Sequence, residues 1–147
     1  MDYKISSNFS MREFTRSATA HRMALDNTPS HTVEERIERL VTDILQPLRD
    51  AWGAPIIVAS GYRCTELNRA VGGVTNSDHK YGSAADIKSI EDTPGQNKKL
   101  FELAVRMMKD GRIRNVKQIL DEYNYDWIHI SRQDGRSAKF NQVLHIK

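Results

Sequence analysis

Residues 77–86, with the sequence SDHKYGSAAD, place a histidine, a glycine and an aspartate at a spacing that suits a divalent metal ion. His79 and Asp86 are seven residues apart, and Gly82 lies between them. A neutral imidazole and a carboxylate are both ligands for zinc, and a glycine allows the backbone to turn between them. We therefore expect this segment to supply two ligands to one metal site.

A second segment, residues 126–129 (DWIH), adds His129 with Asp126 three positions before it. Two histidines and one carboxylate leave zinc an open position for water, which is the layout of a catalytic site. A structural zinc site is closed by four ligands, usually including cysteines. Cys64 is the single cysteine of the chain, so a four-cysteine zinc module and an intramolecular disulfide are both excluded.

Length and composition exclude several classes of protein. The chain has 147 residues, the size of one ordinary domain, of which 39% are hydrophobic and 28% are charged. No run of eighteen apolar residues occurs, so we expect no membrane insertion. The first eight residues lack the apolar core of a secretory signal, which predicts a cytoplasmic protein as synthesised. A nucleic-acid binder typically carries a stripe of clustered basic residues. A net charge of +3 is far less than such a stripe would give, so no nucleic-acid partner is expected.

Capping signals and apolar periodicity predict the long first helix. Thr32 and Glu35 have the spacing of a capping box at its start. The helix is expected to end near Gly53, with Pro47 bending its last turn. The apolar residues that fall on one helical stripe are Val33, Ile37, Leu40, Val41, Ile44, Leu45 and Leu48.

Shorter signals place the other elements and the fold class. A short helix is expected from Phe9, with Ser10 and Glu13 as a capping box, followed by a polar loop over 18–30. The remaining expected elements are strand 56–59, helix 65–71, strand 84–88, a helix from 93 to Gly111, and strands 116–120, 127–131 and 143–146. Helices come first and strands cluster late, which predicts a single α+β domain with helices packed on a small, mainly antiparallel sheet.

Together these residues resemble the zinc peptidases of the D-Ala-D-Ala carboxypeptidase and L-Ala-D-Glu endopeptidase family. Its members cut the peptide part of the bacterial cell wall and share a fold with the hedgehog signalling domain. The resemblance covers roughly residues 8–131 and is carried by residues 60–63 (SGYR), the segment 77–86 and residues 126–131. Residues 9–17 and 45–49 also look like the phage-associated branch of the family.

The resemblance implies a role for each matching residue. His79, Asp86 and His129 would hold Zn²⁺, and Asp126 would be the general base. Side chains alternate along a strand, so residues 126 and 129 would point to opposite faces; we therefore expect Asp126 in the turn before the strand. Arg63 would stabilise the oxyanion or bind a substrate carbonyl or carboxylate, since a guanidinium can donate two parallel hydrogen bonds.

Several other assignments remain open at this stage. By resemblance, Ser77 would anchor the substrate or brace the metal loop. Tyr81 and Trp127 flank metal ligands, so they would either line a substrate groove or pack in the core. Glu122 is a rival to Asp126 as the base, and His145 is expected to have a structural role.

The leading functional hypothesis is a zinc peptidase that hydrolyses the stem peptides of bacterial peptidoglycan. Its context would be a phage or prophage lysis enzyme, an endolysin released through a holin-type pore or carried in a phage particle. One alternative is a cytoplasmic D,D-dipeptidase or carboxypeptidase that acts on soluble precursors. Another is a phage tail or structural module that retains the fold without the reaction.

Overall fold

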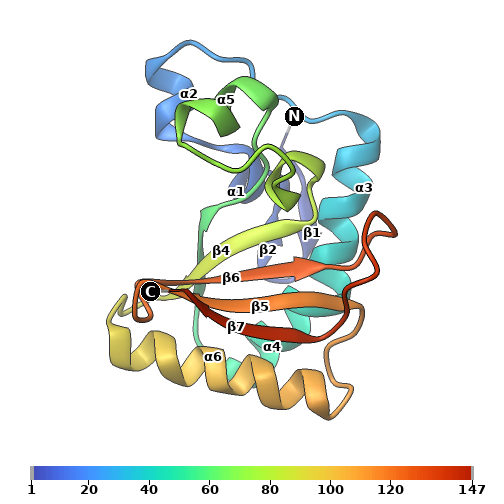
Figure 1. Cartoon of the computed structure of the whole chain (residues 1–147), viewed down its shortest axis with the longest axis vertical. Coiled ribbons are helices and arrows are strands. Elements are labelled where there is room, and N and C mark those ends of the chain that lie inside the picture. The colour runs from blue at the N-terminus through green and yellow to red at the C-terminus, as the bar shows by residue number, and fades with distance from the viewer. Residues whose placement is uncertain (1, 147) are drawn as a thin grey trace.

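The computed structural model describes residues 2–146. In chain order the elements are β1 (Lys4–Ser6), β2 (Phe9–Ser10), α1 (Met11–Thr15), α2 (Ala18–Arg22), α3 (His31–Leu40), the π-helical turn η1 (Val41–Leu45), α4 (Gln46–Trp52), β3 (Ile56–Ser60), α5 (Thr65–Ala70), the 3₁₀ turn η2 (Asp78–Tyr81), β4 (Ala84–Ser89), α6 (Pro94–Lys109), β5 (Val116–Glu122), β6 (Trp127–Arg132) and β7 (Gln142–Ile146). The helices and strands expected from sequence are present, and the fold is α+β as predicted (Figure 1).

The main sheet has five strands in the order β3-β4-β6-β5-β7. All of its pairs are antiparallel except β5 with β7, so the sheet is mainly antiparallel as expected. The strands β4, β6 and β5 occupy its centre, and β7 returns along β5 at one edge (Figure 1). A separate two-stranded ribbon, β1 with β2, was not predicted from the sequence.

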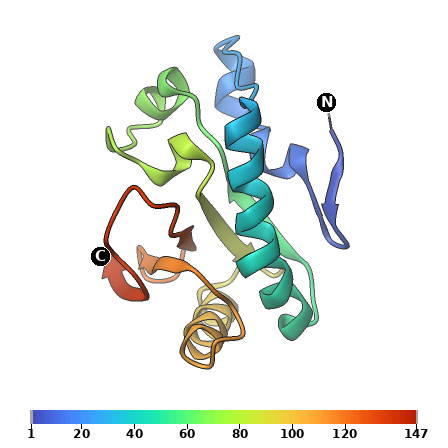
Figure 2. The ribbon, with the colours of Figure 1, turned by 90° about the vertical axis from the view of Figure 1, so that its right-hand side faces the viewer.

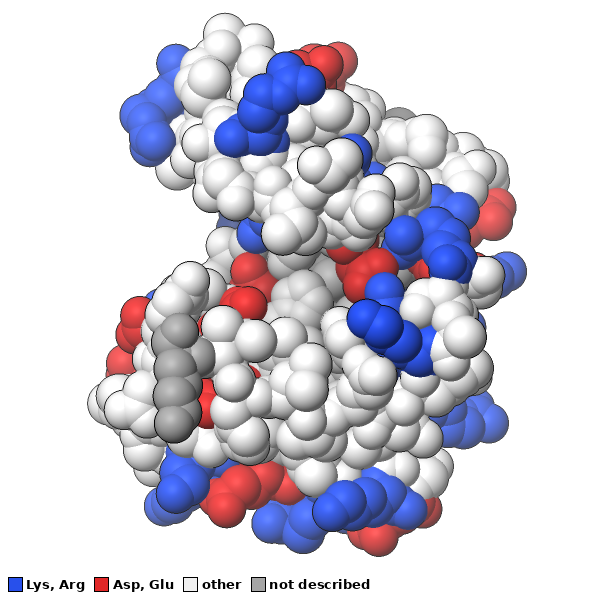
Figure 3. Space-filling view, viewed as in Figure 1, with Lys and Arg blue, Asp and Glu red and all other residues white. Residues whose placement is uncertain are grey.

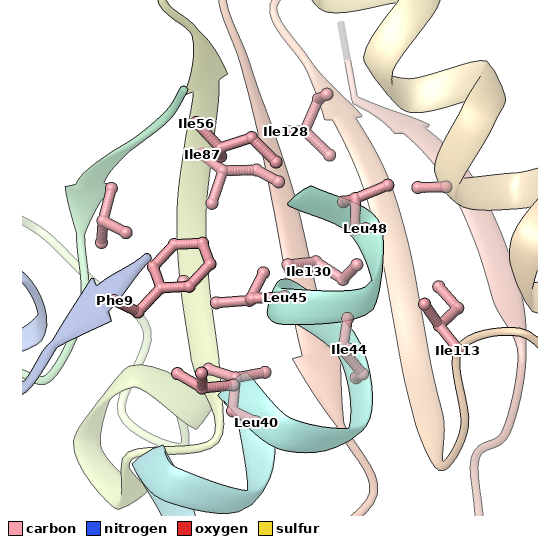
Figure 4. Packing of buried hydrophobic residues seen from close by; sticks show 14 of the residues in the cluster. Phe9, Leu40, Ile44, Leu45, Leu48, Ile56, Ile87, Ile113, Ile128 and Ile130 are labelled. Carbon is pink, nitrogen blue, oxygen red and sulfur yellow. The ribbon is translucent and has the colours of Figure 1, made fainter. Parts of the chain in front are cut away.

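One face of the sheet carries the hydrophobic core. The continuous helix from α3 to α4 crosses this face and α6 packs beside it (Figure 2). Figure 4 shows Ile44, Leu45 and Leu48 of that helix pointing toward Ile128 and Ile130 of β6. These five side chains are fully buried. Because side chains alternate along a strand, the residues between the core positions are directed to the opposite face, which these helices leave open.

Pro47 widens the long helix without ending it. Proline has no N–H, so the carbonyl of Asp43 has no donor four residues later in the helix. That carbonyl instead accepts the backbone N–H of Arg114 at 3.1 Å. The backbone forms the π turn η1 before Pro47 and then continues as α4 to Gly53, which adopts a left-handed conformation at φ 76°. The expected bend is therefore a local π-bulge.

Two expectations about helix starts were wrong. The long helix begins at His31 with Ser30 as its N-cap, and not at the predicted Thr32, because the Ser30 hydroxyl accepts the Val33 N–H at 3.2 Å. The predicted loop over 18–30 contains α2, whose cap Ser17 accepts the Ala20 N–H at 3.1 Å. A serine three residues before a free N–H satisfies one of the unpaired donors at a helix start. The capping box of Ser10 and Glu13 is confirmed.

No helix within residues 2–146 combines the length and the apolar character needed to cross a bilayer.

The contact between η2 and α3 yields a stability prediction. Gly82 ends η2 at φ 80°, and a Cβ there would lie 2.8 Å from the Val33 carbonyl oxygen. Gly53 has a similar φ of 76° but open space around it. We expect Gly53→Ala to cost about 1–2 kcal/mol in free energy of unfolding, and Gly82→Ala to cost a further 1–3 kcal/mol or so through overpacking.

Urea unfolding of the two variants and the parent protein, all without metal, measures this difference. Equal losses for the two variants would contradict the close contact of η2 with α3.

Candidate metal centre

Strand register places two of the predicted ligands opposite each other. Asp86 on β4 pairs directly with His129 on β6, so their side chains lie on the same face of the sheet. The His129 Nδ1 lies 3.0 Å from the Asp86 Oδ1. This face is the one opposite the core, since the neighbouring residues Ile87 and Ile128 are fully buried on the other side. Two residues 43 positions apart are thereby brought together by the backbone alone.

The third ligand comes from outside the sheet, on the short turn η2. The His79 Nε2 lies 3.2 Å from the Asp86 Oδ1. The other ring nitrogen of His79, Nδ1, is 2.7 Å from the backbone carbonyl oxygen of Gly61. That carbonyl can only accept, so Nδ1 carries the proton and Nε2 presents its lone pair toward Asp86. This orientation by a backbone carbonyl is characteristic of metal-binding histidines.

The three residues fit a metal ion by distance and by donor type. One ligand atom from each of His79, Asp86 and His129 lies within 4.8 Å of the other two. Ligands about 2.1 Å from a tetrahedral zinc lie about 3.4 Å from one another, close to the separations observed here. His79 and Asp86 are buried and His129 is partly exposed, so the cluster opens to solvent on one side. A mixed nitrogen and oxygen donor set with an open side suits catalytic zinc.

The charge of Asp86 is stabilised within the cluster. Burial by itself would raise the pKa of Asp86, but its interactions with the His129 and His79 side chains outweigh burial and hold the pKa of the carboxyl below its ordinary value. Asp86 is therefore ionised at neutral pH, as a metal ligand must be.

Arg63 lies beside the cluster and is held through all three of its nitrogens. Its Nε donates to Ser60 Oγ at 3.2 Å, Nη1 to Asn68 Oδ1 at 3.2 Å, and Nη2 to Asp86 Oδ2 at 3.5 Å. Burial lowers the pKa of Arg63 from its usual value, while the carboxylates of Asp86 and Glu122 act in the opposite direction. A guanidinium has five N–H groups, so two remain for a bound molecule.

A groove of about 500 Å³ leads away from the cluster. The metal-site residues Arg63 and Asp86 line it together with Trp127 and Lys88. In the space-filling view the surface is hollowed between the part that carries α2 and α5 and the sheet below it (Figure 3). Trp127, one of the residues expected to contact substrate, thus faces this groove and does not belong to the core.

The β5–β6 hairpin holds both candidate bases. Asp126 is exposed and lies in the turn immediately before β6, as its spacing to His129 required. Glu122 ends β5 opposite Trp127, and the Trp127 indole N–H donates to its carboxylate. Trp127 and His129 share a face by strand alternation. Glu122 therefore lies on the metal-bearing face, by which we mean the face of the sheet that carries the candidate ligands Asp86 and His129.

The other predicted residues have different surroundings. Ser77 is buried, and its hydroxyl accepts the His79 N–H at 3.2 Å, so it braces the metal loop. The Arg136 guanidinium lies over the ring of Tyr81, 3.7 Å from its centre, and Tyr81 is not among the residues that line the groove. His145 is paired with the buried Asp121 at 3.0 Å. His145 is not a member of the His79, Asp86 and His129 cluster.

Sequence reasoning missed the amides that support the site. The Asn27 Nδ2 donates to the carbonyls of Thr15 and Tyr62 at 2.9 and 3.0 Å, and its Oδ1 accepts the Cys64 N–H at 2.7 Å. The buried Asn68 accepts from Arg63 and donates to the Val74 carbonyl at 2.8 Å. No spacing or periodicity in the sequence marks an isolated asparagine in this way.

Two comparisons with known proteins agree with this geometry. A family model described as Peptidase M15 matches residues 7–131, most of the chain. The zinc D-Ala-D-Ala carboxypeptidase of Streptomyces albus G is 50% identical over 44 residues. That match covers 29% of this chain and 17% of the other protein, so the similarity spans less than a fifth of the relative's length.

The cluster predicts one high-affinity Zn²⁺ site. We expect the parent protein to bind one equivalent of Zn²⁺. Loss of a hydrogen bond that supports a ligand typically weakens metal affinity by about 10- to 100-fold. His79→Ala or His129→Ala removes a ligand itself and should weaken Zn²⁺ affinity by more than that. Competition with a chromophoric chelator measures the affinity. His145→Ala is the matched control and should bind Zn²⁺ like the parent. Unchanged affinity in both His79→Ala and His129→Ala would exclude this site.

Proposed function

The chain belongs to the peptidase M15 family, and on that premise we propose that it is a zinc-dependent peptidase that hydrolyses stem peptides of bacterial peptidoglycan. The observation that carries the proposal is the His79, Asp86 and His129 cluster, open on one side to a groove that also contains Arg63. The name of the similar Streptomyces protein, a zinc D-Ala-D-Ala carboxypeptidase, supports both the metal and the class of substrate.

The residues around the cluster have separate proposed roles in peptide hydrolysis. When bound, zinc would lower the pKa of its water to about 7 and polarise a carbonyl. Arg63 offers its two remaining N–H groups to the oxygen that gains charge at the scissile carbonyl, or to a substrate carboxylate. Because Ser60, Asn68 and Asp86 already hold the guanidinium, it is oriented before substrate arrives. Trp127 forms part of the wall of the groove.

A carboxylate must also take a proton from the attacking water and return it to the leaving amine. Asp126 is proposed for this role from its spacing to His129, and Glu122 is the second candidate. Strand register favours Glu122, because it shares the metal-bearing face with Trp127 and contributes to the electrostatic environment of Arg63. Asp126 is exposed in the turn before β6, and neither Asp126 nor Glu122 is among the residues that line the groove.

Substitution of each carboxylate separates these candidates. We expect Glu122→Gln to reduce turnover by about 10²- to 10⁴-fold, the usual contribution of a general base, with Zn²⁺ affinity retained. Asp126→Asn should have the smaller effect, and Glu91→Gln, which alters an exposed carboxylate after β4, should have none. Turnover and chelator competition are measured on all three variants. Loss of turnover in Asp126→Asn alone would assign the base to Asp126.

The finer assignments extend the same proposal. We propose a D,D-carboxypeptidase or L-Ala-D-Glu endopeptidase type of cleavage, in the setting of phage or prophage lysis. The similarity of residues 9–17 and 45–49 to the phage-associated branch supports that setting.

Mass spectrometry of the products tests the function and identifies the bond. Purified peptidoglycan is incubated with the zinc-loaded protein, with His79→Ala as the control, and the released fragments are identified. New amino and carboxyl termini at one stem-peptide bond, absent with His79→Ala, are expected. Release of D-Ala from soluble precursors without attack on the wall would instead indicate the precursor-directed enzyme. No product at all from a zinc-loaded protein would favour a non-catalytic module.

A further inference from the structure

Among the charged residues that line the groove beside the metal cluster, cations outnumber carboxylates. Arg16, Arg63 and Lys88 contribute positive charge, and Asp86, itself a metal ligand, contributes the negative charge. Blue lysine and arginine side chains border the upper side of the hollow in Figure 3, and carboxylates lie on the sheet side below. A bound metal would neutralise Asp86 further. The groove therefore presents a positive wall to any peptide that enters it.

Two of the three cations are already engaged with acidic partners. Arg63 contacts Asp86 at 3.5 Å, and Lys88 contacts Asp92 at 3.2 Å. The guanidinium of Arg16, in contrast, makes no hydrogen bond or ion pair with any residue in the described range 2–146, and it is exposed. Arg16 is thus the cation of this groove with its full set of five donors available.

The backbone of Arg16 is nevertheless held firmly. Its N–H donates to the Arg12 carbonyl at 3.0 Å and caps the end of α1. The next residue, Ser17, caps the start of α2. The Arg16 backbone is fixed between two helix caps, so its side chain can sample only a restricted volume. This restriction lowers the entropic cost of holding a ligand there.

Arg16 also lies where two hollows meet. A second hollow of about 710 Å³ runs along α1 and α2 and shares Arg16, Ser17, Ala18 and Ala59 with the groove. Arg12 lines this second hollow as well, and Glu34 is its one carboxylate within the described residues. A peptide that extends from the metal cluster along the groove would pass Arg16 before it enters the second hollow.

We propose that Arg16 is a specificity-determining residue that binds a carboxylate of the substrate away from the scissile bond. A planar guanidinium can donate two parallel hydrogen bonds to a carboxylate, so an acidic peptide would be preferred to its amide. This inference rests on the proposed function, because it assigns a subsite within the same groove. It predicts that the preferred stem peptides carry a free carboxylate in the segment that lies toward α2.

The test compares a cleavable peptide with its amidated form. The probe is the muropeptide that the wall digestion shows to be cut, used natively and after carbodiimide amidation of its carboxylates. The parent protein should have a higher kcat/KM on the native form than on the amidated form. Arg16→Gln should lower kcat/KM about tenfold on the native form alone, which is the low end of the contribution of a charged hydrogen bond at an exposed site. Arg63 is present in both the parent and Arg16→Gln, so its contribution cancels when the native-to-amide ratios of kcat/KM of the two proteins are compared.

Arg22→Gln is the matched control, since Arg22 is an exposed arginine of α2 that lines neither hollow. Arg16→Lys should recover part of the preference, because it keeps the charge without the forked geometry. Melting temperatures of all three variants should match the parent. Equal losses on native and amidated peptide, or no loss on either, would overturn the proposal.

A binding measurement separates this inference from the proposed function. Trp127 lines the groove, so quenching of tryptophan fluorescence reports occupation without turnover. If the parent cleaves nothing, the probe is a muropeptide with an intact, unamidated stem peptide. If the parent binds this native form more tightly than its amide, and Arg16→Gln removes that difference, the subsite stands and the peptidase assignment fails. Cleavage or binding without an Arg16-dependent preference for the native peptide would refute the subsite.

Discussion

The hydrogen bond between the His79 imidazole and the Gly61 carbonyl is the contact on which the rest of the site depends. At 2.7 Å it fixes the proton on Nδ1 and turns Nε2 toward Asp86. It also joins the short turn η2 to the end of β3, two segments that share no strand ladder. Without it the imidazole could rotate away from the two ligands that the sheet supplies.

The loop after β3 has almost no freedom to shift, which makes this contact rigid. Tyr62 N–H donates to the Phe14 carbonyl at 2.6 Å, and Arg63 N–H donates to the His79 carbonyl at 3.1 Å. A Cβ on Gly61 would lie 2.5 Å from the Phe14 oxygen, so only glycine allows the two backbones to approach this closely. Asn27 fixes the remaining backbone groups. The N-terminal segment is therefore part of the support of the metal site, although it supplies no ligand.

Local signals predicted the elements well and their starts less well. The apolar stripe from Val33 to Leu48 identified the long helix, because burial of one face imposes a 3.6-residue period on the sequence. The choice between Ser30 and Thr32 as its cap was wrong, since both residue types cap helices and the preceding chain decides which hydroxyl reaches a free N–H. In the π turn before Pro47, the Asp43 carbonyl accepts the backbone N–H of Arg114, more than sixty positions away. No local sequence pattern encodes that contact.

Residue identity and spacing alone pointed to His79, Asp86 and His129 as one candidate set of metal donors, and strand alternation predicted that Asp126 lies in a turn. Tertiary packing sets which other side chains lie near these three residues. The pairing of β5 with β6 places Glu122 on the metal-bearing face, and the packing of α1 and α2 brings Arg16 to the groove. The physical reason is that spacing and alternation are local properties of the backbone. Convergence in a groove depends instead on how distant elements pack. The local sequence around such a contact differs little from that around any other buried contact.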